Sequence, residues 1–172
     1  MMSNNLTTYR PQDGPLDLVA VRMDSEKYPR IKAQPAQQVV TGLAQIVGAA
    51  LTYTGRSLPE DDIQRMAAAL YAELLQDYEG VGTANITLEE INYCVRRAVL
   101  GLGPEMYGIN VSSIYRVVCD YALNEGRQAQ ESANNRHAAA RKKALAQSSA
   151  GAMLTTYEGK MLKNSTLKTQ SK

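Results

Sequence analysis

The stretch TANITLEEINYCVRRAVLGLGPEMYGINVSSIYRVVCDYALNEGR, residues 83–127, decides the fold that this sequence predicts. Within it, TLEE at 87–90 has the pattern of a capping box. In such a box the Thr87 hydroxyl accepts a hydrogen bond from the Glu90 amide, and the Glu90 carboxylate accepts one from the Thr87 amide. Apolar residues then recur at helical spacing, at Leu88, Ile91, Val95, Ala98, Val99 and Leu102. This pattern predicts an amphipathic helix over 87–100.

A second amphipathic helix is expected after a turn rich in glycine. The run GLGP at 101–104 ends the first helix, because glycine adopts the left-handed cap conformation and proline cannot continue the ladder. Asn110 or Ser112 can cap the next helix. Its apolar face comprises Val111, Ile114, Tyr115, Val118, Tyr121 and Ala122. Two helices and a turn also make the DNA-reading helix-turn-helix motif, but the connection over 101–109 is longer than that motif's three or four residues. The pattern favours an ordinary helical hairpin.

Two further helices are predicted upstream, over 35–54 and 59–78. Pro35 suits the first turn of the earlier helix, and Gly42 and Gly48 would let another helix approach closely. The later helix opens at Pro59 with three acidic residues, which the helix dipole favours, and it ends with Tyr78 on its apolar face. The predicted core of the protein is Leu43, Ile46, Val47, Ile63, Met66, Leu70, Leu74, Ile91, Val95, Ile114 and Val118.

The two ends of the chain differ in composition from its middle. Residues 1–34 are polar and contain three prolines, and the apolar run LDLVAVRM at 16–23 is expected to be extended and packed on the body. The last predicted helix covers about 110–140, and residues 148–172 are expected to be flexible. We predict an all-α fold: a compact bundle of about four helices (helical domain 35–123), with an irregular N-terminal arm (1–34) and a basic helical extension with a flexible tail (124–172).

Composition excludes several classes of function. No apolar run approaches the ~20 residues of a membrane span, and the first residues lack a secretion signal, so we expect a cytoplasmic protein. Cys94 and Cys119 are expected to be free, buried thiols, and with the single His137 they cannot form a standard zinc site. Glu89 and Glu90 are interpreted as first-turn acids. The sequence contains no phosphate loop, no nucleophile elbow and no facing pair of carboxylates. We therefore expect the protein to bind no metal or cofactor and not to be an enzyme.

Basic residues are the remaining functional signal. Residues 1–123 carry ten Lys and Arg against fourteen Asp and Glu, whereas residues 124–172 carry nine against three. A mildly acidic body is thus followed by a basic tail. These basic residues either form a solvated face or contact the phosphates of nucleic acid, which requires no particular sequence. The candidates are Arg96, Arg97 and Arg116 on the central pair of helices, and Arg127, Arg136, Arg141, Lys142 and Lys143 beyond it.

Four features recur in a fixed order between Leu58 and Arg127. They are an acidic-start helix that ends in tyrosine (59–78), a T-x-x-E-I helix start (87–91), a turn with Gly and Tyr-Gly (101–108), and a helix that ends Y…R (121–127). This order resembles a loose group of small helical proteins encoded by bacteriophages and integrative elements of gut bacteria. Their size, helicity and gene type suggest similarity to helicase-loader and primosome accessory proteins. The lysine-rich connection expected in that group is Gly-Leu-Gly-Pro-Glu-Met here, so the resemblance implies no DNA contact by this turn.

Two hypotheses of function follow. In the first, the chain is a replication adaptor of helicase-loader or primosome type, which binds DNA weakly and a replication protein more strongly in the bacterial host cytoplasm. In the second, it is a structural component of a phage particle or another protein assembly, with a virion subunit as its partner. A second copy of the chain is a further possible partner, and neither hypothesis involves a membrane.

Overall fold

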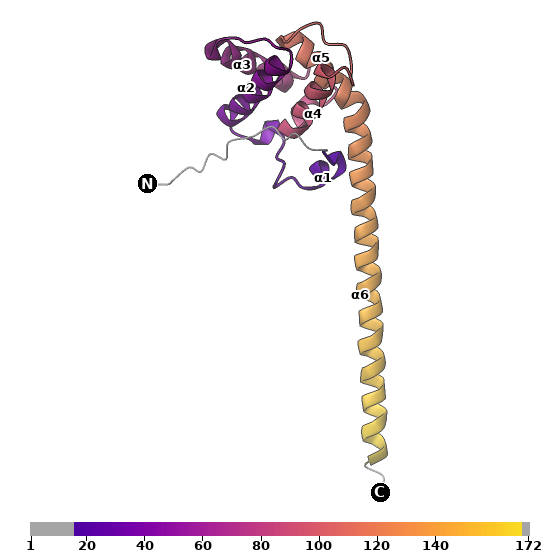
Figure 1. Ribbon diagram of the computed structural model, residues 1–172. Helices are drawn as coiled ribbons and strands as arrows, with labels where there is room; N and C mark the ends of the chain where they lie inside the picture. The colour runs from indigo at the N-terminus through magenta and orange to yellow at the C-terminus, as the bar shows by residue number, and fades with distance from the viewer. Residues whose placement is uncertain (1–15, 170–172) are drawn as a thin grey trace, which may run out of the picture. The chain divides into compact units, whose positions relative to one another are not determined.

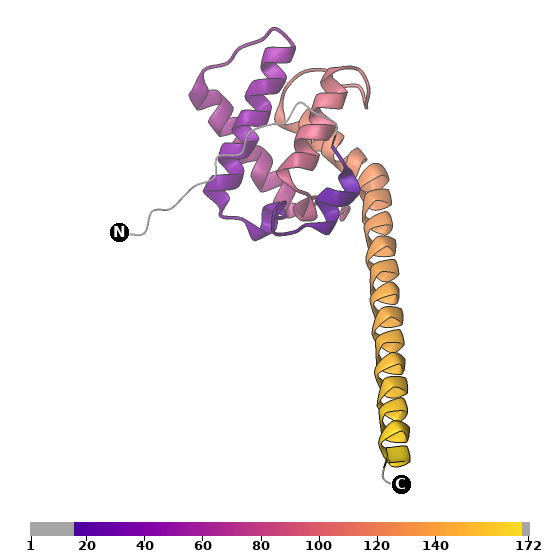
Figure 2. The same cartoon turned by 60° about the horizontal axis from the view of Figure 1, so that its bottom comes forward.

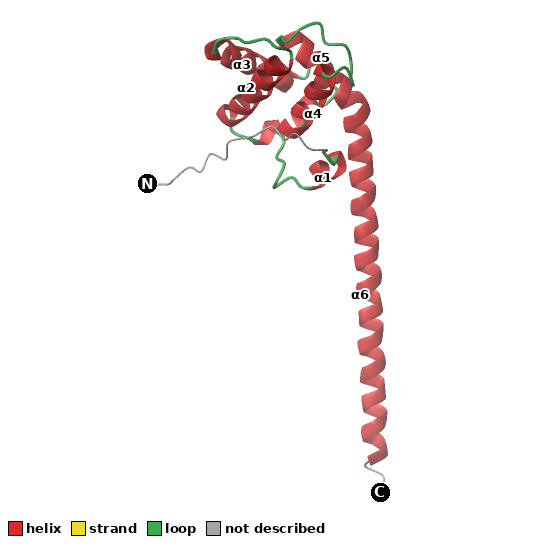
Figure 3. Cartoon of the chain, in the orientation of Figure 1, coloured by secondary structure: helices red, strands yellow, loops and turns green. Residues whose placement is uncertain are grey.

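The computed structural model describes the backbone of residues 16–169 and the side chains of residues 16–148. Across this range the chain forms helices joined by turns and has no strand, which confirms the predicted all-α fold (Figure 3). One isolated β-bridge joins Arg30 to Thr87. The chain divides into two units, residues 1–133 and residues 134–172.

The elements, labelled in Figure 1, are α1 (Leu18–Met23), the 3-10 turn η1 (Ile31–Ala33), α2 (Ala36–Tyr53), α3 (Glu60–Gln76), the 3-10 turn η2 (Thr83–Asn85), α4 (Leu88–Val99), α5 (Val111–Tyr121), the π-helical turn η3 (Ala122–Gly126) and α6 (Arg127–Thr169). The predicted helices 35–54, 59–78 and 87–100 correspond to α2, α3 and α4 within two residues at each end. The predicted helix 110–140 is α5 followed by η3 and the start of α6.

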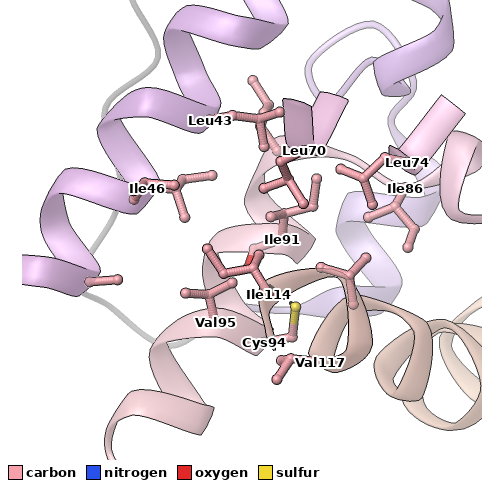
Figure 4. Packing of buried hydrophobic residues seen from close by; sticks show 14 of the residues in the cluster. Leu43, Ile46, Leu70, Leu74, Ile86, Ile91, Cys94, Val95, Ile114 and Val117 are labelled. Atoms are coloured by element: carbon pink, nitrogen blue, oxygen red, sulfur yellow. Dashed lines mark hydrogen bonds between the residues drawn. The ribbon is translucent and has the colours of Figure 1, made fainter. Parts of the chain in front are cut away.

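The core of the first unit lies among α2, α3, α4 and α5. Helices α2 and α5 each pack against both α3 and α4, and Figures 1 and 2 show α2 beside α3 and α4 from two directions. Figure 4 shows apolar side chains from these helices meeting at the centre. The predicted core residues that are buried are Leu43, Ile46, Val47, Leu70, Leu74, Ile91, Val95, Ile114 and Val118. Ile63 and Met66 are only partly buried and pack against this core.

The predicted helix starts and one close helix contact are confirmed. Thr87 and Glu90 form the complete capping box of α4, and the Asn110 side chain accepts from the Ser113 amide to cap α5. A Cβ atom built on Gly42 would lie 2.6 Å from Leu88 Cδ1, so glycine permits the contact between α2 and the start of α4. Nothing lies within 4 Å of the corresponding position on Gly48, so Gly48 has no such role.

Two residues assigned to apolar faces lie outside the helices that should have buried them. Helix α3 ends at Gln76, and the residue that caps it, Asp77, has a left-handed φ of 46°. The Asp77 carboxylate accepts hydrogen bonds from the amides of Val81, Gly82 and Thr83, which compensates for this unfavourable conformation. Tyr78 therefore follows the helix and is 65% exposed, and Leu102, beyond the end of α4, is 63% exposed. Helical spacing cannot show that a helix has already ended.

The N-terminal arm and the C-terminal tail contain helical segments that the sequence analysis did not predict. Leu18–Met23 is helical rather than extended, because the Asp17 carboxylate accepts from the amides of Val19 and Ala20 and so caps α1. At the other end, α6 continues to Thr169, because Ala, Gln, Lys, Leu and Met in this segment have high helix propensity. Residues 170–172 of the predicted flexible tail and residues 1–15 of the predicted irregular arm lie outside the described part of the chain.

Candidate nucleic-acid interface

Arg97, one of the predicted DNA-contacting residues, makes its contacts within the fold. Its guanidinium donates to the Glu125 carboxylate, to the Tyr93 hydroxyl at 3.1 Å and to the Leu102 carbonyl at 2.9 Å. These bonds join the end of α4 to the π-helical turn η3 and to the connection that follows α4. Since contact with a phosphate would compete with them, Arg97 is a poor phosphate ligand.

Arg96 and Arg116, also predicted, lie beside exposed tyrosine rings. The guanidinium carbon of Arg96 is 5.8 Å from the centre of the Tyr53 ring, and that of Arg116 is 6.0 Å from the centre of the Tyr107 ring. Arg116 also donates to the Glu105 carbonyl at 3.0 Å. Tyr107 is 81% exposed and Tyr53 is 49% exposed, so both rings are open to a ligand.

Arg56, which the sequence analysis did not select, lies at the same end of the bundle. It is exposed in the α2–α3 loop, and its Nη1 lies 3.8 Å from the position of a Cβ atom on Gly108, next to Tyr107. The α2–α3 loop therefore meets the α4–α5 connection. The sequence signal that could have identified Arg56 is its position in a turn, between Gly55 and Ser57. We call Tyr53, Arg56, Arg96, Tyr107 and Arg116 the arginine–tyrosine surface.

This surface combines two groups that single-stranded nucleic acid requires. Guanidinium groups bind phosphate oxygens through paired N–H donors. Exposed aromatic rings stack on bases without regard to sequence. The Glu105 carboxylate in the same connection accepts a hydrogen bond from the Tyr107 hydroxyl, which fixes the position of that ring. The arrangement offers groups that can contact phosphates and bases.

The remaining predicted residues all belong to α6. Arg127 is in the first unit and donates to the Glu131 carboxylate at 3.2 Å. Arg136, Arg141, Lys142 and Lys143 are in the second unit, and all four are exposed. Because successive residues of an α-helix point about 100° apart, Arg141, Lys142 and Lys143 face three directions. The helix places them close in sequence but does not gather them on one face.

Glu90 is the centre of a buried polar cluster, which we call the Glu90 cluster. Its side chain is fully buried (0% exposed), and its Oε2 accepts from the Thr87 amide at 2.9 Å, as the capping box requires. Its Oε1 accepts from the Arg22 Nε and from the Tyr121 hydroxyl at 2.7 Å. The Arg30 Nη1 lies 3.5 Å from Oε2. Glu90 thus holds the N-terminal arm against the bundle, beyond its predicted role as a first-turn acid.

The hydroxyl of Tyr121 stabilises this carboxylate, and its loss should be measurable. We expect Tyr121→Phe to lower the free energy of unfolding by about 1.5–3 kcal/mol, because a hydrogen bond to a buried charge is lost. Burial and the charge of Glu90 raise the pKa of Tyr121, which keeps the hydroxyl a donor. Tyr115 on the same helix has a buried hydroxyl that bonds no carboxylate and interacts with the weakly polar Cys119 thiol, so Tyr115→Phe is the matched control. Equal losses in urea unfolding of the two variants would contradict the assignment.

Cys94 and Cys119 are free and buried, as predicted, and burial raises the pKa of both thiols, so they are poor nucleophiles. Among the side chains of residues 16–148, no three His, Cys, Asp or Glu residues gather as metal ligands would. None of the described helices has the length and apolar character that a membrane span requires.

The chain was compared with protein-family models, with curated proteins and with solved structures, and no match was found in any of the three comparisons.

Proposed function

We propose that this protein is a non-catalytic adaptor that binds single-stranded DNA through the arginine–tyrosine surface and acts with a partner protein in DNA replication, in the cytoplasm of a bacterial host. One observation carries the proposal. Two exposed tyrosine rings, Tyr53 at the end of α2 and Tyr107 in the α4–α5 connection, each lie beside an arginine, and the loop that follows Tyr53 meets that connection. The order of motifs between residues 58 and 127, which resembles that of small phage-encoded helical proteins, supports the replication setting.

The two rings suit single strands better than duplex DNA. Stacking on a base requires a base that is not already stacked between its neighbours, which a single strand provides. The second helix of the hairpin, α5, begins with Val111, Ser112 and Ser113 and has no cluster of base-reading side chains. The proposed binding is therefore insensitive to sequence and depends on phosphates and stacking.

The second unit of the chain supports the partner in this proposal. Every described side chain from Asn134 to Ser148 on α6 is exposed. A helix that is polar on all sides is commonly stabilised by contact with another molecule. This observation also favours the alternative function, in which the chain is a structural component of a phage particle and α6 contacts a virion subunit or a second copy of the chain.

The test of DNA binding compares two variants that lose the same charge. Arg56→Gln with Arg116→Gln should reduce the affinity for a single-stranded oligonucleotide by roughly tenfold at ~50 mM salt, and should lower the slope of log affinity against log salt by about 1.4. Lys27→Gln with Lys32→Gln should have little effect, because both lysines precede the first residue of α2, whereas Tyr53 is its last residue and a helix of 18 residues is about 27 Å long. Fluorescence anisotropy over a salt series measures both quantities.

Two further variants locate the binding surface. Tyr107→Ala should weaken binding of single strands by about 1–3 kcal/mol while leaving duplex binding unchanged. A triple variant, in which Arg141, Lys142 and Lys143 are all changed to Ala, should weaken binding less than Tyr107→Ala does if the binding surface lies on the bundle. If only this triple variant lost binding, α6 would be the contact. If wild-type protein did not bind DNA at ~50 mM salt, the replication proposal would fail and the structural one would stand.

The two functions also differ in the partner. Purification of the protein from phage-infected cells, followed by mass spectrometry, should recover replication proteins in the first case and virion proteins in the second. Substitution of the exposed face of α6 should remove that partner without unfolding the bundle, because the described side chains after Ala133 do not contribute to the core.

A further inference from the structure

A groove of about 530 Å³ lies in the first unit, next to the Glu90 cluster and away from the arginine–tyrosine surface, with which it shares no residue. Its lining includes Arg22, Arg30, Gly82, Gly126 and Arg127. A volume of this size lies within the range of small-molecule sites in proteins. Nothing in the proposed DNA contact uses this groove.

The floor of the groove carries more positive than negative charge. Arg22 and Arg30 share the single carboxylate of Glu90, so two positive charges face one negative charge and the trio has a net charge of +1. The Arg30 Nη1 is buried and has no hydrogen bond, its nearest carboxylate oxygen being 3.5 Å away. A guanidinium does not lose its proton in proteins, so this charge cannot be removed by titration.

Burial makes the excess charge costly. Burial lowers the pKa of Arg30, and the neighbouring charge of Arg22 lowers it further, against the opposing effect of Glu90. The rim adds a third guanidinium, Arg127, whose Nε is paired with Glu131 at the exposed edge. A bound anion would satisfy donors that Glu90 alone does not.

Two glycines of the lining cannot be given a side chain without backbone strain or a close contact. Gly82 has a φ of +86°, which a side chain would strain. A Cβ atom on Gly126, in the π-helical turn η3, would lie 3.0 Å from the Arg22 Nη2 and 3.3 Å from the Tyr121 ring. The Gly82 amide itself donates to Asp77, so the loop supplies space and the arginines supply the donors.

We propose that this groove binds the terminal phosphate of a nucleotide-sized ligand, through the guanidinium groups of Arg22, Arg30 and Arg127. A phosphate monoester offers three acceptor oxygens and up to two negative charges, which suit several converging guanidinium groups better than a carboxylate does. Its source is either a free nucleotide or the 5′ end of a DNA strand, both of which present the same group.

Calorimetric titration of the full chain with dAMP and with deoxyadenosine tests the proposal. We expect dAMP to bind with a Kd near or below about 1 mM and deoxyadenosine not to bind at this concentration. A 5′-phosphorylated oligonucleotide and its 5′-hydroxyl form then distinguish the sources. Tighter binding of the 5′-phosphorylated strand than of its 5′-hydroxyl form identifies a DNA end, and equal affinity for the two strands identifies a free nucleotide.

Two arginines give a matched pair of variants. Arg127 and Arg65 are similarly exposed, at 77% and 78%, and each pairs with an acidic residue on its own helix. Arg127→Gln should weaken dAMP binding severalfold, and Arg65→Gln should not change it. Arg30→Lys keeps the charge but loses the second donor arm, and should weaken binding by about tenfold or more if its thermal unfolding remains cooperative.

The comparison of Arg127→Gln with Arg65→Gln tests the proposal even if Arg30→Lys does not fold. Absence of dAMP binding to wild-type protein at about 1 mM, equal binding of deoxyadenosine, or the same affinity in Arg127→Gln and Arg65→Gln would each overturn the proposal.

Discussion

Glu90→Ala is expected to lower the free energy of unfolding by about 3–5 kcal/mol, one of the largest effects of any single substitution in this chain. Removal of the carboxylate leaves Arg22 and Arg30 without their shared partner. Tyr121 loses the acceptor of its hydroxyl, and Thr87 loses half of the capping box. The cost arises mainly from the two guanidinium groups left without compensation, because a buried charge without a partner is far less stable than a hydrated one.

Glu89 provides the control, because it is the adjacent residue in the same first helical turn. Glu89→Ala removes a favourable interaction with the helix dipole, worth about 0.3–1 kcal/mol, but removes none of the bonds that Glu90 makes. Urea unfolding of both variants measures the difference. If Glu89→Ala and Glu90→Ala cost the same, Glu90 would be only a first-turn acid.

Leu70→Ala is expected to cost about 2–5 kcal/mol, because Leu70 is fully buried among the bundle helices and its truncation leaves a cavity. Leu75 lies on the same helix and is 40% exposed, so Leu75→Ala removes the same atoms with much less loss of packing. Chemical denaturation of the two variants should separate them by about 2 kcal/mol or more. A loss below ~0.5 kcal/mol for Leu70→Ala would show that α3 packs by another face.

Local signals explain what could be predicted. The capping box at 87–90 and the Asn110 cap depend on residues three positions apart, and the core side chains follow from helical spacing. The helix ends were less predictable. Asp77 ends α3 by hydrogen bonds to a loop up to six residues further on, and no periodic pattern contains that information.

The candidate sites were harder to predict, because they depend on contacts distant in sequence. Arg22 and Glu90 are 68 positions apart, and neither the polar arm nor the acidic helix start indicates that they meet. Arg96 and Arg97 are adjacent arginines near the end of the same helix and cannot be told apart in the sequence. In the structure, the Glu125 carboxylate pairs with Arg97, and the Tyr53 ring lies beside Arg96. Sequence can identify which residues carry charge, but only packing decides which groups each charge contacts.

The position of Arg22 and Arg30 on the N-terminal arm has a consequence for local unfolding. The arm is also joined to the start of α4 by the Ile31 amide, which donates to the Ile86 carbonyl at 2.9 Å. Detachment of the arm would therefore break the contacts that hold the first turn of α4, and fraying of that turn would release the arm. We expect the two segments to unfold as one cooperative unit, so that their amide hydrogens exchange together, although more than fifty residues of chain separate them.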